Sequence, residues 1–570
     1  MLLSNRSQIY TKLMEKNIFK IREKIRLFLY KIKITPLSFL LILIIFFLAF
    51  IPRSFDLGTG LTYDEQYWLI RAPSFFNAVI HLDFVNTIKS GHPGVTTMWL
   101  SGIFMKLFSD QDMLFPHILT IARFPVALVT SLGILAMYFL LKELFSEKIA
   151  LLGVIFIALD PFYIAHSRLI HLDALLTTFM VLSFLSLLVY LVRPEKAIYL
   201  FLAGIFLGLA LLTKLPSFIL IPIFILTLLI WYLINDHNIN HNFKKIATDC
   251  SKIVVRIFKP LFIVLSVAVF VFILLWPVMW VNPIYAEIRV AGCLFNVLTT
   301  PHFAGFLLGA AEDTSSFGAL FYPLEILIKI TPLTFIFPLF CISILFYNIC
   351  NKKFSKENLI IISLIFFIFI FTLVMTFAQK KFDRYLLPIF PLIDILAAVG
   401  VYYFYSIIAK RLDSIKVHKK TIFKIFLVFI LVFQISLLLP IAPYYLSYSN
   451  PIMYGGPKNA PNITLIGWGE GNDLAAEYLN QKPNPENITV WAEYYGFEQY
   501  FKGKTISLPL GTATKNNTAT SDYLVFYVCA VQRHLDDDLW NTYKNQTPEK
   551  KITLNDIDYC WIYQTNSGSL

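Results

Sequence analysis

The sequence predicts a polytopic α-helical membrane protein that carries a soluble α/β domain at its C-terminal end. Of the 570 residues, 57% are hydrophobic and only 15% are charged, whereas a soluble domain carries about 25% charged residues. The apolar residues fall into blocks of roughly 17–25 residues, the length that a helix needs to cross about 30 Å of hydrocarbon. A helix is the expected backbone there because lipid offers no partners for N–H and C=O groups. The third observation is a sharp change of composition near Pro440.

About eleven blocks are predicted to cross the membrane, each long and apolar enough to do so. They lie near 37–52, 119–141, 149–166, 173–192, 198–213, 216–234, 260–281, 322–348, 358–377, 385–408 and 421–440. The region 198–234 also allows a re-entrant pair. The first block begins near Pro36 and lacks a small-residue cleavage site, so we expect an anchor and not a cleaved signal peptide.

Charge bias in the loops predicts the orientation, because Lys and Arg accumulate on the cytoplasmic side. Basic residues outnumber acidic ones by nine to two in 1–36, by five to two in 235–259 and by six to one in 409–424. On the other face, the loop 53–118 has four basic and six acidic residues, and the tail from 441 has nine and thirteen. The sequence therefore predicts a cell-membrane protein with a cytoplasmic N-terminus and an extracytoplasmic C-terminal domain. The net charge of +12 is a topology signal, and no basic patch on a soluble domain indicates nucleic acid.

Three regions are expected. Residues 1–36 are a basic cytoplasmic segment, either an amphipathic helix on an anionic leaflet or a disordered tail. Residues 37–440 form the transmembrane domain, and 441–570 the extracytoplasmic α/β domain, in which stretches such as 488–491 and 523–528 are typical of strands. Whether Cys529 and Cys560 pair in that domain stays open, because pairing cannot be deduced from spacing.

Polar residues at the outer membrane edge are the candidates for chemistry. Asp64 and Glu65 stand in the first outer loop beside aromatic residues. Two adjacent carboxylates near apolar surface have raised pKa values, which favours a general base; an ordinary helix start, where acids favour the first turn, explains the pair as well. His92, in Gly91-His92-Pro93-Gly94, either donates to a phosphate or orients a carboxylate, or is a turn residue.

A denser group lies between two predicted spans, with His166, Arg168, His171 and Asp173. Ionisable residues at membrane edges are usually functional. Two histidines and an aspartate invite a metal, but their spacing matches no established site, so no metal ligand is predicted. Arg168 is expected to hold Asp173 or the substrate in place.

Basic residues on the outer face oppose the usual charge bias and therefore need another reason. Lys214 follows one apolar block, and Lys380 and Arg384 follow another. A bound anion such as a lipid phosphate supplies the reason, because Arg clamps phosphate oxygens bidentately and Lys acts as a point charge. Snorkelling to lipid headgroups is the alternative for each.

In this order, the motifs resemble the C-type glycosyltransferase superfamily, with the closest likeness to protein O-mannosyltransferases and to transferases that add aminoarabinose to lipid A. Asp64-Glu65 is similar to the acidic pair in the family's first outer loop, and Gly91-His92-Pro93-Gly94 to its His-Pro-Pro element with the second proline replaced. Three further elements of the family have similar segments here. Its Arg-x-x-x-Leu-Asp pattern is similar to Arg168–Asp173, its lysine element to Gly208–Lys214 and its Arg-Tyr-x-x-Pro element to Arg384–Pro388. The likeness covers about 37–440 and leaves the tail unexplained.

The resemblance implies an enzyme that moves one sugar, mannose or a similar one, from a polyprenyl- or dolichyl-phosphate donor to an acceptor hydroxyl on the outer face, with inversion. Asp64 would be the base, with Glu65 and Asp173 as further catalytic carboxylates. The residues implied to hold the donor phosphate are Arg384, Lys214, Lys380 and His92, with Arg168, His171 and Tyr385 in support. No cofactor is predicted beyond this donor substrate, and a divalent metal stays an alternative, since relatives differ.

The expected partners are membrane lipid, the lipid-linked donor and an acceptor that is a protein, a glycolipid or a cell-wall polymer. Two rival functions remain, a lipid-linked glycan transporter or flippase and a ligase that moves a whole glycan. Transporters favour ionisable groups near the bilayer midplane and repeated halves, whereas here the charges cluster at the outer edge.

Overall fold

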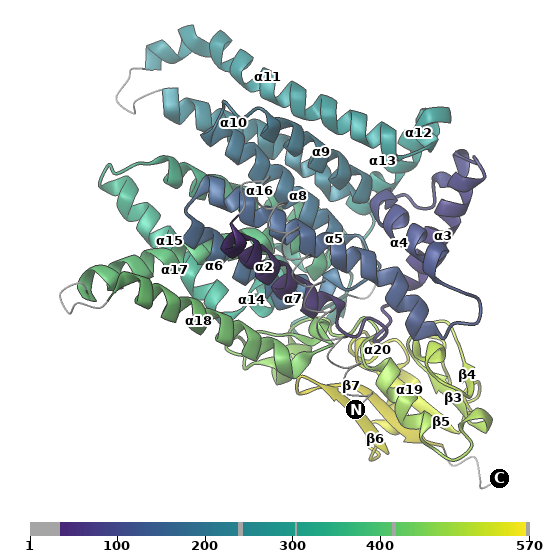
Figure 1. Ribbon diagram of the computed structural model, residues 1–570. Coiled ribbons are helices and arrows are strands. Elements are labelled where there is room, and N and C mark those ends of the chain that lie inside the picture. Colours follow the sequence, from purple (N-terminus) through teal and green to yellow (C-terminus); the bar gives the residue numbers. More distant parts are fainter. Residues whose placement is uncertain (1–34, 237–242, 302–304, 413–417, 566–570) are drawn as a thin grey trace, which may run out of the picture.

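The computed structural model describes residues 35–236, 243–301, 305–412 and 418–565. Figure 1 shows a block of long helices with a smaller sheet domain, formed by the C-terminal part of the chain, at one end of it. The predicted polytopic helical fold with a C-terminal α/β domain is confirmed. The predicted basic segment 1–36 lies almost wholly outside the described residues.

Within the described part, nine helical segments are long and apolar enough to cross a membrane. They comprise α2 (Pro36–Ser54), α5 (Phe115–Leu144), α8 (Asp173–Val192), α10 (Leu220–Asp236), α11 (Phe243–Leu275), α15 (Pro332–Cys350), α16 (Lys356–Phe377), α17 (Phe390–Leu412) and α18 (Lys419–Leu438). The spans containing α8 and α17 are the most enclosed, each 89% buried inside the protein. These two helices therefore form the centre of the block.

Two predicted spans are each divided into two helices in the structure. The block 149–166 is two helices, α6 (Glu147–Ala158) and α7 (Pro161–Ser167), bent by 61°. The bend follows from Asp160, whose side chain caps α7, and from the proline after it, since proline favours the first position of a new helix. The block 322–348 divides in the same way into α14 (Phe321–Lys329) and α15, with Thr331 as the cap and Pro332 as the first residue. The predicted block 198–213 coincides with α9 (Ile198–Thr213), a helix of 16 residues that is short for a span.

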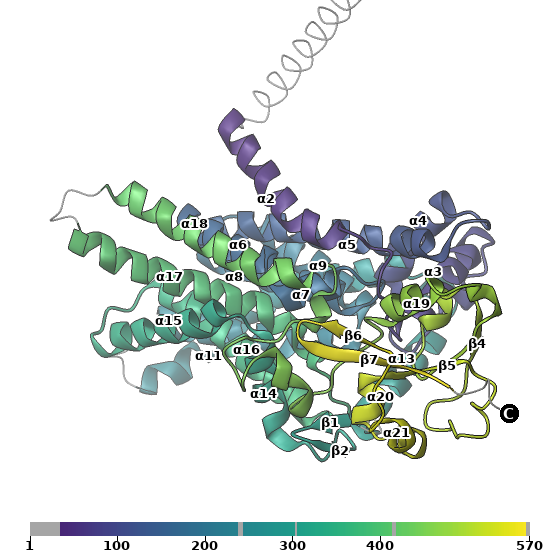
Figure 2. The same ribbon diagram turned by 90° about the horizontal axis from the view of Figure 1, so that it is seen from below.

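The shorter elements gather at the end of the block that carries the C-terminal domain. They are α3 (Glu65–Ile80), α4 (Val95–Phe108), α12 (Val278–Val281), α13 (Pro283–Thr299) and the hairpin β1 (Gly305–Leu307) and β2 (Ala310–Glu312). Figure 2 shows α3, α14 and the hairpin beside the C-terminal domain, and Leu307 forms a bridge with Thr464 of that domain.

The C-terminal domain is a five-stranded mixed sheet of order β4-β3-β5-β7-β6. Its strands are β3 (Thr489–Ala492), β4 (Lys504–Ile506), β5 (Tyr523–Tyr527), β6 (Lys550–Leu554) and β7 (Ile557–Gln564), and its helices are α19 (Asn472–Asn480), α20 (Val528–Gln532) and α21 (Asp537–Tyr543). β3 pairs in parallel with β4 and β5, and β7 pairs antiparallel with β5 and β6. Apolar clusters cover both faces, one with α19 and one with α21. Cys529 and Cys560 are buried there as free thiols.

Hydrogen bonds fix this domain to the helical block. The Gly60 amide donates to Asp473 Oδ2 at 2.9 Å, and the Tyr500 hydroxyl donates to the Gly58 carbonyl at 3.0 Å.

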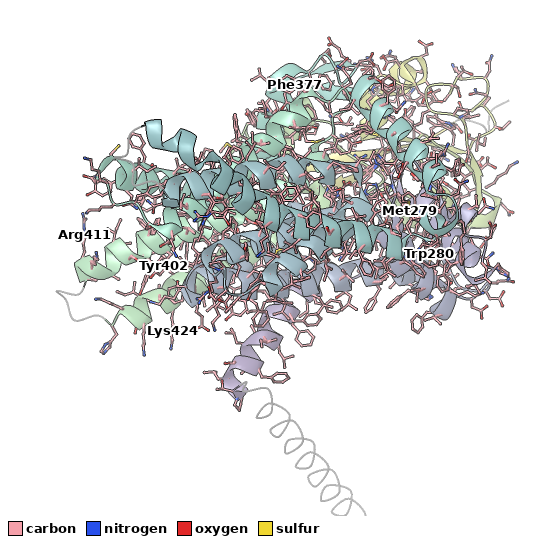
Figure 3. The ribbon with its side chains drawn as sticks, turned by 90° about the horizontal axis from the view of Figure 1, so that it is seen from above. Met279, Trp280, Phe377, Tyr402, Arg411 and Lys424 are labelled. Carbon is pink, nitrogen blue, oxygen red and sulfur yellow. The ribbon has the colours of Figure 1, made fainter. Side chains whose placement is uncertain are left out.

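At the far end of the block, Figure 3 shows Arg411 and Lys424 on α17 and α18, away from Met279 and Trp280. The end of α17 at Arg411 and the start of α18 near Lys424 thus lie at the opposite end of the helical block from the C-terminal domain.

Candidate active site

The acidic pair divides at the start of α3, where Asp64 precedes the helix and Glu65 is its first residue. The preceding loop is held from the C-terminal domain, because the Tyr63 amide donates to the Trp468 carbonyl at 2.8 Å. The side chain of Asp64 remains 30% exposed, whereas that of Glu65 is 0% exposed. The two carboxylates therefore have different surroundings although they are adjacent.

Glu65 is saturated by hydrogen bonds from its own protein. Arg123 of α5 reaches it from Nε at 2.7 Å and from Nη2 at 2.5 Å. The amide and hydroxyl of Thr62 donate to Oε2 at 3.0 and 2.9 Å, and the Ile170 amide donates to Oε1 at 2.8 Å. Arg123 also donates to three backbone carbonyls of the loop 57–60. This pair fixes the loop before α3 and leaves no room for substrate at Glu65.

Asp64, His171, Asp173, Lys214 and Arg384 form a cluster of ionisable side chains. Its most enclosed member is Asp173, the first residue of α8, whose side chain is 2% exposed. Lys214 follows the last residue of α9 and brings its Nζ to 2.6 Å from Asp173 Oδ1. His171 Nδ1 lies 3.0 Å from Asp173 Oδ2, and its Nε2 lies 3.5 Å from Asp64 Oδ2. His171 therefore links the two carboxylates.

Arg384 connects the same carboxylates from the other side. It belongs to the short 3₁₀ segment Asp383–Ile389 before α17. Its Nη2 lies 3.1 Å from Asp64 Oδ2, and its Nε lies 3.7 Å from Asp173 Oδ2. Its Cζ lies 4.1 Å from the ring centroid of Phe382 and 4.2 Å from that of Trp468. The C-terminal domain thus contributes an aromatic face to the cluster.

The cluster holds Asp64 ionised. Burial alone would raise its pKa, but the hydrogen bond from His171 and the charges of Arg384 and Lys214 outweigh burial and lower the pKa well below the ordinary value. Burial lowers the pKa of Lys214, against the opposing effect of Asp173. The two aspartates raise the pKa of His171 in spite of its burial.

Two cavities meet at the pair of Asp64 and Arg384. The first, here called the cationic cavity, has a volume of about 300 Å³. It is lined by Asp64, Tyr67, Trp68, Arg71, Ser90, His92, His171, Leu172, Lys214, Arg384 and Tyr385. Lys214 Nζ lies 4.5 Å from the ring centroid of Tyr385, so this tyrosine forms part of the wall around the ammonium group.

His92 and Arg71 face the cationic cavity with unused capacity. His92 Nδ1 is buried and has no hydrogen-bond partner among the described residues. Burial and the charge of Lys214 lower the pKa of His92 to about 3, so the ring is a neutral hydrogen-bonding group. Arg71 contacts the rings of Tyr67 and Trp68 at 5.2 and 5.1 Å. No carboxylate of the described chain lies within ion-pair distance of it.

The second cavity, here called the mixed cavity, has a volume of about 260 Å³ and lies between the helical block and the C-terminal domain. Asp64 and Arg384 line it as well. Its charged wall residues include Glu325, Lys329, Lys381, Asp383, Glu470 and Arg533, and its aromatic residues include Tyr63, Phe306, Phe317, Phe382 and Trp468. His166 also faces it.

Two predicted residues lie away from the cluster. Arg168 does not hold Asp173, because its guanidinium donates to the carbonyls of Pro52 and Asp56, each at 2.9 Å. The first of its two expected roles, holding Asp173, was therefore wrong, since the chain turns between α7 and α8 and directs Arg168 to the end of α2; the second, holding the substrate, stays a prediction. Lys380 donates to Asn296 Oδ1 at 2.8 Å and lines neither cavity. Among the described residues, no group of three or more His, Cys, Asp or Glu side chains is arranged to hold a metal ion.

Three residues of the site were missed from sequence. Arg123 stands inside an apolar span, and an intramembrane charge of this kind is a functional or structural signal by itself. Arg71 lies in the loop 53–118, which the charge bias predicts to be on the outer side, so the argument that selected Lys214 applies to it as well. Trp468 follows Gly467 and precedes Gly469, and nothing in that stretch indicates a contact with Arg384.

Part of the chain is similar to a known protein family. Residues 92–280 match the family described as dolichyl-phosphate-mannose-protein mannosyltransferase. The matched segment includes His92, His171, Asp173 and Lys214, and the predicted resemblance to C-type glycosyltransferases is confirmed. No curated protein matches the sequence.

Solved structures of membrane glycosyltransferases are also similar to this chain. ArnT from Cupriavidus metallidurans, bound to undecaprenyl phosphate, shares 15% identity, with 92% of this chain and 96% of that chain covered and a TM-score of 0.44. The archaeal oligosaccharyltransferase AglB from Archaeoglobus fulgidus, in complex with an inhibitory peptide and a dolichol-phosphate, shares 13% identity, with 88% of this chain and 72% of that chain covered and a TM-score of 0.46. The Pmt1-Pmt2 protein O-mannosyltransferase complex of S. cerevisiae, bound to the sugar donor, shares 19% identity, with 44% of this chain and 34% of that chain covered and a TM-score of 0.33.

The pair of Glu65 and Arg123 predicts a stability effect. Arg123→Met leaves the buried Glu65 carboxylate without its cationic partner and removes the donor that Arg123 supplies to three backbone carbonyls, and breaking a buried ion pair costs about 3–5 kcal/mol. Thermal unfolding of the purified protein in detergent is therefore expected at a clearly lower midpoint. Arg71→Met is the matched control and should unfold near the wild-type midpoint. Equal midpoints for Arg123→Met and wild type would show that the pair does not hold the loop.

Proposed function

We propose that this chain is a membrane glycosyltransferase of the C type, which transfers one sugar from a polyprenyl-phosphate donor to an acceptor hydroxyl with inversion. The observation that carries this proposal is the position of Asp64. It is the most exposed carboxylate of the cluster, and it lies where the cationic cavity and the mixed cavity meet. A base at such a boundary can serve an acceptor on one side while the leaving group is held on the other.

The cationic cavity suits the donor phosphate. Arg384 and Lys214 bring positive charge to its wall. Arg71 adds a guanidinium that pairs with no carboxylate of the described residues, and His92 adds a neutral ring with one nitrogen that has no partner among them. Arg recognises phosphate oxygens bidentately and Lys acts as a point charge. Each preorganised group of this kind is typically worth about 3–4 kcal/mol of barrier when charge develops on the leaving phosphate.

In the proposed reaction, the acceptor oxygen attacks the anomeric carbon while Asp64 takes the hydroxyl proton. The bond from the anomeric carbon to the phosphate oxygen breaks, and its electron pair leaves with the lipid phosphate. The products are the glycosylated acceptor, the lipid phosphate and a protonated Asp64, which returns its proton to water. A single in-line displacement inverts the anomeric carbon.

Donor binding prepares Asp64 for this task. In the free protein its pKa is low because His171 and Arg384 stabilise the carboxylate, and such a carboxylate is a weak base. A phosphate in the cationic cavity competes for Arg384 and Lys214 and adds negative charge nearby, which raises the pKa of Asp64. The base thus becomes stronger when the donor is in place.

The other carboxylates act as positioning residues in this proposal. Asp173 orients Lys214 and His171, and His171 in turn holds Asp64. Glu65 fixes the loop before α3 through Arg123. We place the site and the C-terminal domain on the extracytoplasmic face and the N-terminus in the cytoplasm, in accord with the charge bias of the loops.

The transporter alternative finds less support in the geometry. Transporters use ionisable groups near the middle of discontinuous helices. Here Asp173 is the first residue of α8, Lys214 follows α9 and Arg384 precedes α17. Charges that sit at helix ends beneath a soluble domain favour chemistry at the membrane edge.

The first test is sugar transfer by the purified protein in lipid, with radiolabelled polyprenyl-phosphate mannose and related donors and a panel of acceptors. Asp64→Asn is expected to lower the transfer rate by about 10²–10⁴-fold, the usual contribution of a general base. Asp56→Asn, an exposed residue of the same loop, is the matched control and should transfer at the wild-type rate. Undiminished transfer by Asp64→Asn would remove the assigned base.

The second test concerns the donor phosphate. Because His92 Nδ1 has no hydrogen-bond partner in the part of the chain that the structure describes, His92→Leu leaves no described group unpaired and should not lower the unfolding midpoint. Loss of a hydrogen bond to a charged phosphate, about 1.5–3 kcal/mol, is expected to raise the donor KM by roughly 10–100-fold. An unchanged donor KM would place the phosphate away from His92.

A further inference from the structure

The mixed cavity lies on the side of Asp64 from which an acceptor must arrive. In an in-line displacement, the nucleophile and the leaving group stand on opposite sides of the anomeric carbon. If the leaving phosphate occupies the cationic cavity, the acceptor hydroxyl comes from the other cavity that Asp64 lines. The residues that line the mixed cavity therefore indicate the chemical class of the acceptor.

The charges of this cavity largely have partners within the protein. Lys329 Nζ lies 3.6 Å from Asp383 Oδ2, and Lys381 Nζ donates to the Ala378 carbonyl at 2.9 Å. Glu470 accepts from the Trp468 amide at 2.5 Å. Carboxylates and cations occur together on the wall, so neither a phosphorylated nor a strongly basic ligand is favoured.

Two buried side chains that line this cavity have polar atoms without a hydrogen-bond partner among the described residues. Glu325 is 3% exposed and His166 is 2% exposed. Glu325 binds the Thr464 hydroxyl through Oε1, whereas within the described part of the chain its Oε2 has no partner and neither ring nitrogen of His166 has one. A buried polar atom without a partner costs about 1–3 kcal/mol, so a ligand that supplies hydrogen bonds would relieve three such costs.

Hydroxyl groups meet this requirement, because each both donates and accepts. A carboxylate oxygen needs a donor, while a neutral imidazole needs one donor and one acceptor. Burial and Asp383 raise the pKa of Glu325 to about 7, so near neutral pH its carboxyl group both donates and accepts. Several hydroxyls on one rigid ring reach such atoms at once.

The remaining wall is aromatic. Phe382 and Trp468 face the cavity beside Arg384, and flat apolar faces pack against the C–H face of a sugar ring. The volume of about 260 Å³ lies just below the 300–1,000 Å³ of pockets for drug-sized ligands. This size suits one sugar ring and not an extended peptide, and a serine or threonine side chain would leave Glu325 and His166 unsatisfied.

We propose that the acceptor is a carbohydrate, and that the mixed cavity holds its terminal neutral sugar ring through Glu325, His166 and the aromatic face of Trp468. This inference rests on the proposed function for the direction of attack, but the binding of a sugar in the cavity can be measured without any transfer.

The test uses two substitutions with a matched control. His166→Phe removes a side chain that makes no hydrogen bond to any described residue, and Glu325→Gln keeps the shape of the carboxyl group. His117→Phe replaces an exposed histidine that lines neither cavity. Binding of neutral methyl glycosides, including methyl α-mannopyranoside and methyl β-glucopyranoside, is followed by saturation-transfer NMR on the full chain in nanodiscs without donor. An N-acetylated threonine tripeptide amide is the competing probe.

Wild type and His117→Phe are expected to bind at least one methyl glycoside and not the peptide, and both cavity variants to weaken that binding at least tenfold. With a donor that supports transfer, the same variants should raise the KM for the glycoside at least tenfold and leave the donor KM unchanged. Failure of transfer with glycoside binding retained would count against the proposed function alone.

Three results would overturn the inference. One is the absence of glycoside binding by wild type. Another is binding and glycosylation of the peptide in preference to every glycoside. The third is a rise of the donor KM in His166→Phe and Glu325→Gln with the acceptor KM unchanged, which would assign the mixed cavity to the sugar of the donor.

Discussion

Two carboxylates that share their cations set the arrangement of this protein. Asp64 and Asp173 are both bound by Arg384 and by His171, and Asp173 also binds Lys214. A charge taken out of water must be paired, and a broken buried pair leaves the other charge at a high cost. The start of α3, the start of α8, the end of α9 and the 3₁₀ segment before α17 therefore have to meet at one point. Asp64 and Arg384, which lie at that point, line both cavities.

Most of the fold follows from apolar block length, and every predicted span coincides with at least one helix. The sequence did not show where a block breaks. Asp160-Pro161 and Thr331-Pro332 each combine a capping side chain with a proline at the first helical position, and this local signal ends one helix and begins another inside an apolar run. The strands around 488–491 and 523–528 were found because alternation is local, whereas the order of the sheet depends on contacts far apart in the sequence.

The sequence predicted the site residues that are recognisable by their type and their position at a helix end. It did not predict those whose role depends on where the side chain points. Asp64, Lys214 and Arg384 were found from their residue types at the membrane edge, and the structure brings them together. Arg168 has the same signal but turns the other way, since only the path between α7 and α8 decides where it points. Glu65 could not be separated from Asp64 before Arg123 was placed beside it. Trp468 belongs to a domain that the motifs do not cover, so its contact with Arg384 is a product of tertiary structure alone.

Binding of the lipid phosphate in the cationic cavity can be tested most directly by a cryo-electron microscopy structure of the chain in nanodiscs with undecaprenyl phosphate. We expect phosphate density within hydrogen-bond distance of Lys214, Arg384 and His92, with the lipid tail leaving toward the membrane. Phosphate bound at another place, with Lys214 and Arg384 still engaged only by Asp173 and Asp64, would contradict it.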